Sequence, residues 1–372
     1  MKTSGLYVHI PFCKSKCRYC DFNSYAKMDW YISPYFSALF EEIKLMSKRY
    51  PQTYDTIYFG GGTPSLIEPS LICRTLTLIR ECFHITDNAE ITLECNPGTI
   101  DFEGLRSLNA AGINRLSIGL QSTCDNFLKT LGRIHTFNDF TECLSSARRA
   151  GFQNISVDLM YGLPDMTLCD WESTLRETAE FGVEHISCYS LKIEKGTPFW
   201  RMKLNLPDDD SVADMYDLAV SKLKEYGYNR YEISNFSKPG KESRHNLKYW
   251  QSHNFLGIGA GAFSCMEGIR FSNVLGISDY IAKIKSGDTA QAKTDVLDKF
   301  DLMSEFTFLG LRLADGISET EFESRFNLPI DQVFGEPLKK YTKMGFLIRE
   351  NGIIRFSDKG FFVSNAILSD FV

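Results

Sequence analysis

Short apolar segments rich in β-branched residues alternate with helical segments through the first 200 residues of this 372-residue chain. Such alternation is typical of parallel strands covered by helices. Six units are too few for a closed eight-stranded barrel, so we predict an α/β fold with an incomplete (β/α)6 barrel of the TIM type. Functional side chains are then expected on the loops that follow the strands. The expected strands are residues 6–10, 55–59, 90–95, 115–119, 154–160 and 184–189, with helices at 34–49, 71–82, 101–111 and 139–150.

The sequence pattern divides the chain into three regions. Residues 1–205 form the predicted barrel, and residues 206–295 form a connecting region. From 296 to 372 the pattern changes to helices, two short strands at 346–349 and 353–356, and a last helix. This order predicts a small winged-helix-like domain. Its eight acidic and seven basic residues between Ser318 and Val372 favour a structural or docking role over DNA binding.

Composition limits the class of protein. The formal net charge is −6 at pH 7, which argues against a sequence-independent nucleic-acid binder. The same negative charge, and the lack of a recognisable RNA-binding module, also disfavour an enzyme that modifies RNA. No apolar run approaches the length of a membrane span, so only peripheral contact with a membrane is compatible with the sequence. We expect a cytoplasmic protein.

Three cysteines, Cys13, Cys17 and Cys20, follow the first expected strand with the spacing C-x3-C-x2-C. Three thiolates can hold a [4Fe–4S] cluster and leave one iron open for chemistry. A structural zinc site is the main alternative, but zinc needs four protein ligands, and the nearest further candidates are His9 and the distant Cys73. Disulfides fit poorly, because the 11 cysteines are odd in number and a reducing compartment is expected. The other eight cysteines show no ligand spacing and are expected to pack as small apolar side chains.

Glycine and polar residues follow the other expected strands. The run GGGTP at residues 60–64 comes directly after the second strand. Consecutive glycines permit positive φ and let a ligand lie against bare backbone. Glu94, Gln121 and Asp158 lie within or next to the following three strands. An acid such as Asp158 in an apolar strand is either a ligand-binding group or a buried structural anchor.

The cysteine spacing and the glycine run together resemble the radical S-adenosylmethionine (SAM) superfamily. The resemblance implies that SAM binds the open iron and that an electron from the cluster cleaves it. It extends over nearly the whole chain to the coproporphyrinogen-oxidase branch of that superfamily. No catalytic side chain is assigned. In that branch the residues that would line the SAM site are Tyr7, Tyr19, Gly61, Gly62, Thr63, Glu94, Gln121, Arg133 and Asp158.

Two functional classes within this branch stay open. One is the oxygen-independent coproporphyrinogen III dehydrogenase, a SAM-dependent oxidoreductase that converts two propionates to vinyls. The other is the HemW type of heme chaperone, which delivers heme to apoproteins. Phe22 stands where the dehydrogenase has a fourth cysteine, only five residues precede the first strand, and residues 245–250 read HNLKYW, an HNxxYW motif. These features favour the chaperone, and with it a protein that is not an enzyme.

The chaperone resemblance implies a set of ligands and partners. They are heme, an apo-hemoprotein acceptor, a heme donor and an electron donor for the cluster. His245 is the candidate heme ligand, because imidazole is a common axial ligand, and Tyr249 and Trp250 could stack on a porphyrin. The alternative is a loop histidine whose aromatic neighbours pack under the connection. His9 is expected to be structural.

Overall fold

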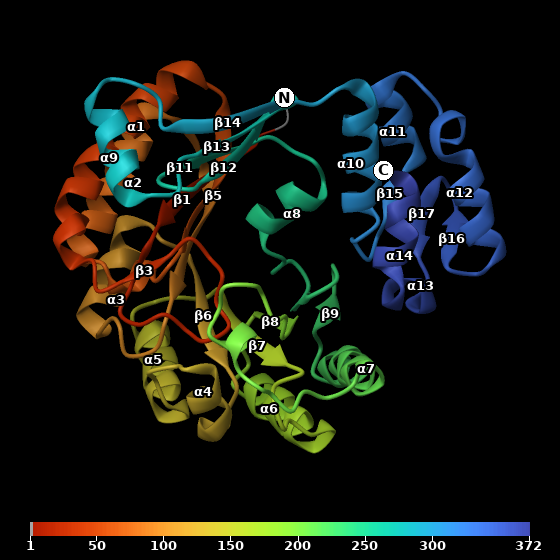
Figure 1. Ribbon diagram of the computed structural model, residues 1–372, viewed down its shortest axis with the longest axis horizontal. Helices are drawn as coiled ribbons and strands as arrows, with labels where there is room; N and C mark the ends of the chain where they lie inside the picture. Colours follow the sequence, from red (N-terminus) through yellow and green to blue (C-terminus); the bar gives the residue numbers. More distant parts are fainter. Residues whose placement is uncertain (1–2) are drawn as a thin grey trace.

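Six parallel strands form the centre of the protein. The computed structural model describes residues 3–372. In it, β1, β4, β5, β6, β7 and β8 pair in this order, and every neighbouring pair is parallel. The sheet curves into an open barrel (Figure 1), which confirms the predicted (β/α)6 architecture. The strands are Ser4–Ile10, Thr53–Gly61, His84–Cys95, Arg115–Gln121, Ile155–Tyr161 and His185–Ser190.

Helices cover the convex face of this sheet (Figure 1). They pack there because side chains alternate along each strand, and the outward set is apolar: Leu6, Val8, Ile57, Phe59 and Leu93 are all completely buried. Two of these helices, α4 and α6, were not among the helices expected by residue range from the sequence. The helices are α1 (Ile32–Arg49), α2 (Pro69–Cys82), α3 (Phe102–Ala111), α4 (Asp125–Leu131), α5 (Phe137–Arg149) and α6 (Leu168–Glu180).

The region expected to be a connection extends the sheet at both edges. Strand β11 (Phe255–Ile258) pairs in parallel with β1, and β10 (Asn235–Ser237) pairs antiparallel with β8. The sheet therefore has twelve strands among the described residues. The domain boundaries at 205 and 295 stay predictions. The further elements of this connecting region are α7 (Asp209–Glu225), β9 (Asn229–Arg230), α8 (Arg244–Trp250), β12 (Phe263–Met266), β13 (Ile269–Asn273), α9 (Ile277–Lys285) and β14 (Gln291–Val296).

Helix α8, which contains the HNxxYW motif, lies on the concave side of the sheet (Figure 1). The Glu90 carboxylate of β5 accepts hydrogen bonds from the backbone N–H groups of Arg244 and His245, at 3.2 and 3.1 Å. Lys248 pairs with Asp55 of β4, with its Nζ 2.6 Å from Oδ1. The positive N-terminus of a short helix is thus held by a buried acid, which fixes α8 inside the barrel.

The elements from α10 onward have an apolar core of their own, in which Leu311, Phe322, Ile354 and Phe371 are completely buried. Their three-stranded sheet has the order β15-β17-β16. Helices followed by a small antiparallel sheet match the expected winged-helix-like pattern. The elements are α10 (Lys299–Gly310), β15 (Ile317–Ser318), α11 (Glu319–Phe326), α12 (Asp331–Lys343), β16 (Leu347–Glu350), β17 (Ile353–Phe356), α13 (Asp358–Phe362) and α14 (Ser364–Leu368).

Within the described residues, the structure has no helix with the length and apolar character that crossing a bilayer requires. Its short elements are β2 (Phe12–Cys13), β3 (Tyr25–Ala26) and the 3-10 helices Asp29–Tyr31, Pro64–Leu66, Phe199–Arg201 and Ser369–Phe371.

A buried carboxylate joins α1 to the added edge of the sheet. Glu42 accepts hydrogen bonds from the Gly259 N–H at 2.8 Å, the Tyr280 hydroxyl at 2.6 Å and the Asn273 amide at 2.7 Å. Burial raises the pKa of Glu42, while these three donors oppose that shift. The three donors lie on the turn after β11, on β13 and on α9. A single carboxylate therefore satisfies buried donors from three parts of this edge of the sheet.

We expect Glu42→Ala to destabilise the fold by about 2–4 kcal/mol, because it leaves three buried donors without an acceptor. Urea unfolding followed by circular dichroism measures the change. Glu41→Ala is the matched control: Glu41 is exposed on the same helix and pairs only with Lys44, so its loss should cost less than about 0.5 kcal/mol. Equal effects of the two substitutions would contradict the role given to Glu42.

Candidate cofactor site at the mouth of the barrel

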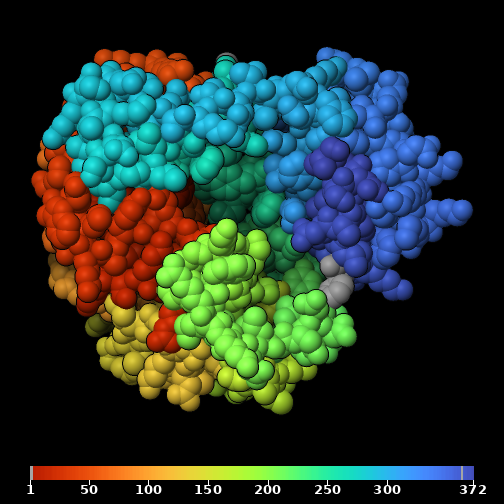
Figure 2. All heavy atoms as spheres, in the orientation of Figure 1, coloured from red at the N-terminus to blue at the C-terminus, as the bar shows by residue number. Residues whose placement is uncertain are grey.

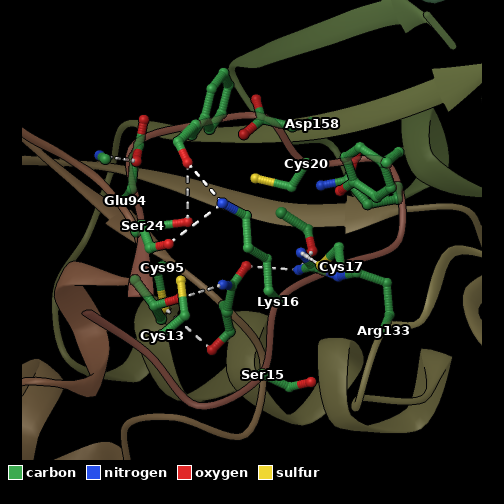
Figure 3. A pocket seen from close by; sticks show the side chains of 18 of the residues that line it. Cys13, Ser15, Lys16, Cys17, Cys20, Ser24, Glu94, Cys95, Arg133 and Asp158 are labelled. Atoms are coloured by element: carbon green, nitrogen blue, oxygen red, sulfur yellow. Dashed lines mark hydrogen bonds between the residues drawn. The ribbon is translucent and has the colours of Figure 1, made fainter. Parts of the chain in front are cut away.

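The three cysteines lie together in one cavity at the carboxyl ends of the strands (Figure 3). Cys13 ends β2, and Cys17 and Cys20 follow on the loop between β1 and α1. The Cys20 N–H donates to the Cys17 carbonyl at 3.3 Å, so the two residues share one turn. All three thiols are partly exposed and free of disulfides.

The surroundings of the three thiols affect how they would bind a metal. Burial raises the pKa of Cys13 and Cys20, so these thiols keep their protons until a metal displaces them. No group of three His, Cys, Asp or Glu side chains in residues 3–372 lies close enough to hold one ion. A [4Fe–4S] cluster needs wider spacing, because each thiolate binds a different iron. The three thiols share one cavity, an arrangement compatible with a cluster in which each thiolate binds its own iron.

The glycine turn after β4 packs directly against the cysteine loop. Gly62 N–H donates to Ile10 O and Thr63 N–H donates to Phe12 O, both at 2.8 Å. A Cβ on residue 62 would lie 2.6 Å from the Phe12 oxygen, so only glycine fits there. Gly61 has a φ of +116°, which favours glycine as well. The turn thus brings bare backbone to the cavity that holds the thiols.

A hydrogen-bonded chain connects this turn to the cysteines and to β6. The Asn96 amide donates to Thr63 Oγ1 at 2.9 Å, and Arg133 donates to Asn96 Oδ1 at 2.5 Å. Arg133 also donates to the Gly119 carbonyl at 2.7 Å and contacts Cys17 Sγ at 3.6 Å. The guanidinium thus places a positive charge beside a future thiolate, where it stabilises the ionised form.

Asn96 was missed by the sequence reasoning. It follows the end of β5 by one residue, so the rule that polar groups gather after strands could have found it. Other residues that the sequence reasoning did not single out line the same cavity, among them Lys16, Ser24 and Ser117. Their only sequence signal is their position on the cysteine loop or on an inward-facing strand position.

Two half-buried carboxylates, Glu94 on β5 and Asp158 on β7, face the cavity from strands on either side of β6 (Figure 3). Glu94 accepts from the Tyr58 hydroxyl and the Gly61 N–H, both at 3.0 Å. Burial, and then the charge of Asp158, raise the pKa of Glu94 to about 7. Burial also raises the pKa of Asp158, which accepts from Ser117 at 3.1 Å. A cationic ligand would relieve the unfavourable burial of both acids.

The structure brings nearly all the predicted SAM residues together. Tyr7 is the exception, because it lines a second cavity that adjoins the first. Gln121 ends β6 with a φ of +73°, uncommon for a residue with a side chain. The residues that share the cavity with the cysteines are Tyr19, Gly61, Gly62, Thr63, Glu94, Gln121, Arg133 and Asp158.

The second cavity has a volume of about 710 Å³ and a largely apolar lining. It shares a wall with the first, and Figure 2 shows this face hollowed between the N-terminal part, the green segment and the blue C-terminal domain. Phe22, at the position of the missing fourth cysteine, lines both cavities and is 64% exposed. The shared wall consists of Lys16, Phe22, Ser24, Gly61 and Glu94.

His245 lies on helix α8 and not on a loop, and it lines neither cavity. Its Nδ1 is 2.8 Å from Thr56 Oγ1, and its Nε2 is 2.8 Å from the Tyr249 hydroxyl. Burial, and then the charge of Lys248, lower its pKa to about 3. Because both ring nitrogens are hydrogen-bonded, this geometry favours a packing role, and heme ligation by His245 stays a prediction.

His9 is structural in the same sense, because both of its ring nitrogens have partners. They contact the Tyr7 hydroxyl at 3.0 Å and the Asn23 carbonyl at 2.8 Å. The expectation that the remaining cysteines pack as core residues is confirmed for the buried Cys95, Cys143 and Cys188, whereas Cys73, Cys82, Cys124 and Cys265 are only partly buried. It is wrong for Cys169, which is exposed on α6. Cys169 lies in the first turn of an amphipathic helix, on the face toward solvent. The sequence around a single cysteine does not indicate which face of a helix it occupies.

Comparison with known proteins agrees with this geometry. Residues 7–178 match the family described as the radical SAM superfamily, and residues 297–363 match the HemN C-terminal domain. A heme chaperone HemW from Bacillus subtilis is 34% identical, over 98% of this chain and 98% of its own. A heme chaperone HemW from Lactococcus lactis is 35% identical, over 100% of this chain and 98% of its own.

Among solved structures, the coproporphyrinogen III oxidase HemN from Escherichia coli, titled a radical SAM enzyme, has the same fold. The TM-score is 0.89, the match covers 99% of this chain and 90% of that one, and the identity is 24%. At that identity the likeness shows the fold alone, whereas the HemW relatives match at higher identity over their full length. The chain belongs to the radical SAM superfamily and, within it, to the HemW family.

Proposed function

We propose that this protein is a cytoplasmic heme chaperone, which binds heme and delivers it to apo-hemoproteins. The observation that carries the proposal is the identity of 34–35% over the full length of proteins named heme chaperone HemW. Phe22 supports it, because a phenyl ring occupies the position where the dehydrogenase resemblance calls for a cysteine. The large apolar cavity beside the cysteines offers space for a porphyrin.

The residues at the barrel mouth fit a [4Fe–4S] cluster and SAM. Cys13, Cys17 and Cys20 would hold the cluster, which supplies an electron and an open iron when it is present. Glu94 and the bare backbone of the glycine turn would bind the cationic methionine part of SAM, with Asp158 as a second acid. Arg133 holds a positive charge beside Cys17 and orients Asn96 toward Thr63.

The partners follow from this activity. A chaperone needs a heme donor, an apo-hemoprotein acceptor and, where the cluster is reduced, an electron donor. Nucleic acid is not among them, since the net charge of −6 gives no basis for phosphate binding. The C-terminal unit, with its separate core, is the candidate docking module for a protein partner.

One comparison separates the chaperone from an oxidative decarboxylase. The protein is reconstituted anaerobically and given SAM, reductant and coproporphyrinogen III, and the products are weighed by mass spectrometry. We expect no loss of carboxyl groups, and we expect the heme-loaded protein to transfer heme to a heme-free b-type cytochrome. Catalytic formation of a product that lacks two carboxyl groups would make the protein a dehydrogenase instead.

Cys17→Ser should abolish the cluster, because a serine hydroxyl is a poor ligand for iron in a site that supplies only three thiolates. Iron and sulfide analysis with visible absorption after reconstitution measures the loss. Cys169→Ser is the control, since that thiol is exposed on α6 far from the loop in sequence, and it should keep a full cluster. A full complement of iron in Cys17→Ser would disprove the ligand assignment.

SAM affinity should increase as the pH rises through about 7, because Glu94 is protonated below its pKa of about 7 and anionic above it. A cationic ligand prefers the anion, so binding lowers that pKa and strengthens with pH. Calorimetric titration of the reconstituted protein between about pH 6 and pH 8 measures this.

Glu94→Gln should weaken SAM binding by about tenfold or more at high pH and flatten the dependence of SAM affinity on pH. Glu103→Gln, at an exposed position on α3, should leave the profile unchanged. An unchanged slope in Glu94→Gln would assign the titration to another group.

A further inference from the structure

Three segments that meet around the cysteine loop are basic, although the whole chain has a net charge of −6. Backbone hydrogen bonds join them, because the Arg18 N–H donates to the Leu131 carbonyl and the Phe199 N–H donates to the Arg18 carbonyl, both at 3.0 Å. The fold therefore gathers positive charge that the sequence distributes over distant positions. The segments contain three, two and three lysines or arginines and no aspartate or glutamate, and they comprise residues 14–20, 126–134 and 195–203.

Most of this charge lies at the protein surface. Lys16 and Arg133 line the cavity that holds the cysteines. The other six basic side chains are exposed and do not line that cavity, and we call them the basic rim. Figure 2 shows part of the N-terminal region, in red, at the surface between a yellow segment and a green segment. The basic rim consists of Lys14, Arg18, Lys129, Lys195, Arg201 and Lys203.

The charges of the basic rim are not neutralised within the protein. Among residues 3–372, none of the six side chains forms an ion pair, and Arg18 donates only to the Thr130 carbonyl, at 3.2 Å. The two acids that flank the segments in sequence, Asp21 and Glu194, both act on Lys192, which pairs with Glu194 at 2.7 Å. Like charges that gather on one surface repel one another, so a partner of opposite charge would stabilise them.

The basic rim adjoins one of the cysteine thiols. Cys17 lines the main cavity and also a small hollow beside it, together with Lys14 and Ile134. Ile134 is 56% exposed, and Trp200, which precedes Arg201, is 55% exposed. Aromatic side chains and arginine are enriched where proteins bind one another. A thiol that would bind the cluster is therefore bordered by a surface with the composition of a protein interface.

We propose that the basic rim is the docking surface for a small acidic redox protein that delivers an electron to the cluster. The proposal rests on the cluster of the proposed function, and it does not depend on whether heme is delivered. The step is the transfer of one electron: the reduced carrier is oxidised, the 2+ state of the cluster is reduced to the 1+ state, and no bond forms or breaks.

Charge and position both favour this kind of partner. Opposite charges speed the encounter of two proteins, and they matter most where the interface is small, as in complexes that transfer electrons. An electron carrier must also approach the cluster, and the basic rim borders Cys17. The other hollow on this face, the 710 Å³ cavity, is lined by none of the three cysteines.

Binding of a flavodoxin, an acidic flavin protein, to the reconstituted protein tests the surface directly. Lys129→Glu combined with Arg201→Glu should weaken binding at least about tenfold at an ionic strength of about 0.02 M. Neither side chain lines the cysteine cavity or has an ion pair among the described residues, so the variant should fold and keep its cluster. Calorimetric titration measures the affinity.

The matched control is Lys224→Glu combined with Lys339→Glu, which changes the net charge equally on α7 and α12. It should alter the affinity for flavodoxin less than about twofold, because both positions lie outside the three basic segments. Circular dichroism and cluster absorption show that each variant has folded.

Stopped-flow reduction of the cluster by reduced flavodoxin gives a second measurement. The rate constant should fall as salt is added, and the two double variants should reach the same rate at about 0.5 M salt, where the attraction is screened. Excess dithionite should reduce the cluster to the same extent in every variant, because a small reductant needs no docking surface.

Each contrary outcome has a distinct meaning. A protein that assembles no cluster overturns the cofactor assignment together with this proposal. A full cluster with equal flavodoxin affinities and rates in the two double variants overturns the docking surface alone. Stronger charge-dependent binding to phosphatidylglycerol vesicles, or to a heme-free b-type cytochrome, would assign the basic rim to a membrane or to the heme acceptor and overturn it as well.

Discussion

Two backbone hydrogen bonds, from Gly62 to Ile10 and from Thr63 to Phe12, determine how the rest of the site is built. They continue the pairing of β1 and β4 beyond the ends of the strands, where the chain would otherwise diverge into loops. Because residue 62 has no side chain, the cysteine loop lies directly on the glycine turn. Thr63 then reaches Cys13 and Asn96, and through Asn96 it is joined to Arg133. The contact therefore helps to place Cys13, Asn96 and Arg133 around the cavity.

The concave side of the barrel contains polar side chains on β4 and β5, and helix α8 supplies their hydrogen-bond and ion-pair partners. Buried polar groups destabilise a fold unless they find partners. Glu90, Thr56 and Asp55 find theirs on α8, through its N-terminal backbone, His245 and Lys248. Polar contacts with β4 and β5 therefore hold α8 against the strands on this side of the sheet. Such contacts fix a single arrangement of the helix relative to the strands.

Much of the fold and most of the cofactor site could be predicted from the sequence. Strands such as β1, β6 and β7 combine apolar runs with short lengths, and residues at their carboxyl ends gather by topology alone. The edge strands could not be foreseen: β10 has three residues, and the glycine-rich run around β11 gives no periodic signal. No helix was expected at His245, because a seven-residue helix such as α8 is too short to show periodicity. That His245 hydrogen-bonds both to β4 and to Tyr249 is a tertiary fact that no local pattern carries.

The segment from Lys16 to Ser24 forms the partition between the two cavities, with Lys16 Nζ bonded to the carbonyl oxygens of Phe22 and Ser24. Any molecule that orders this partition from one side changes the work needed to bind a molecule on the other. By thermodynamic linkage the two effects are equal, so occupancy of either cavity alters the affinity of the other by the same factor. A partition that responds to both ligands would therefore couple their binding.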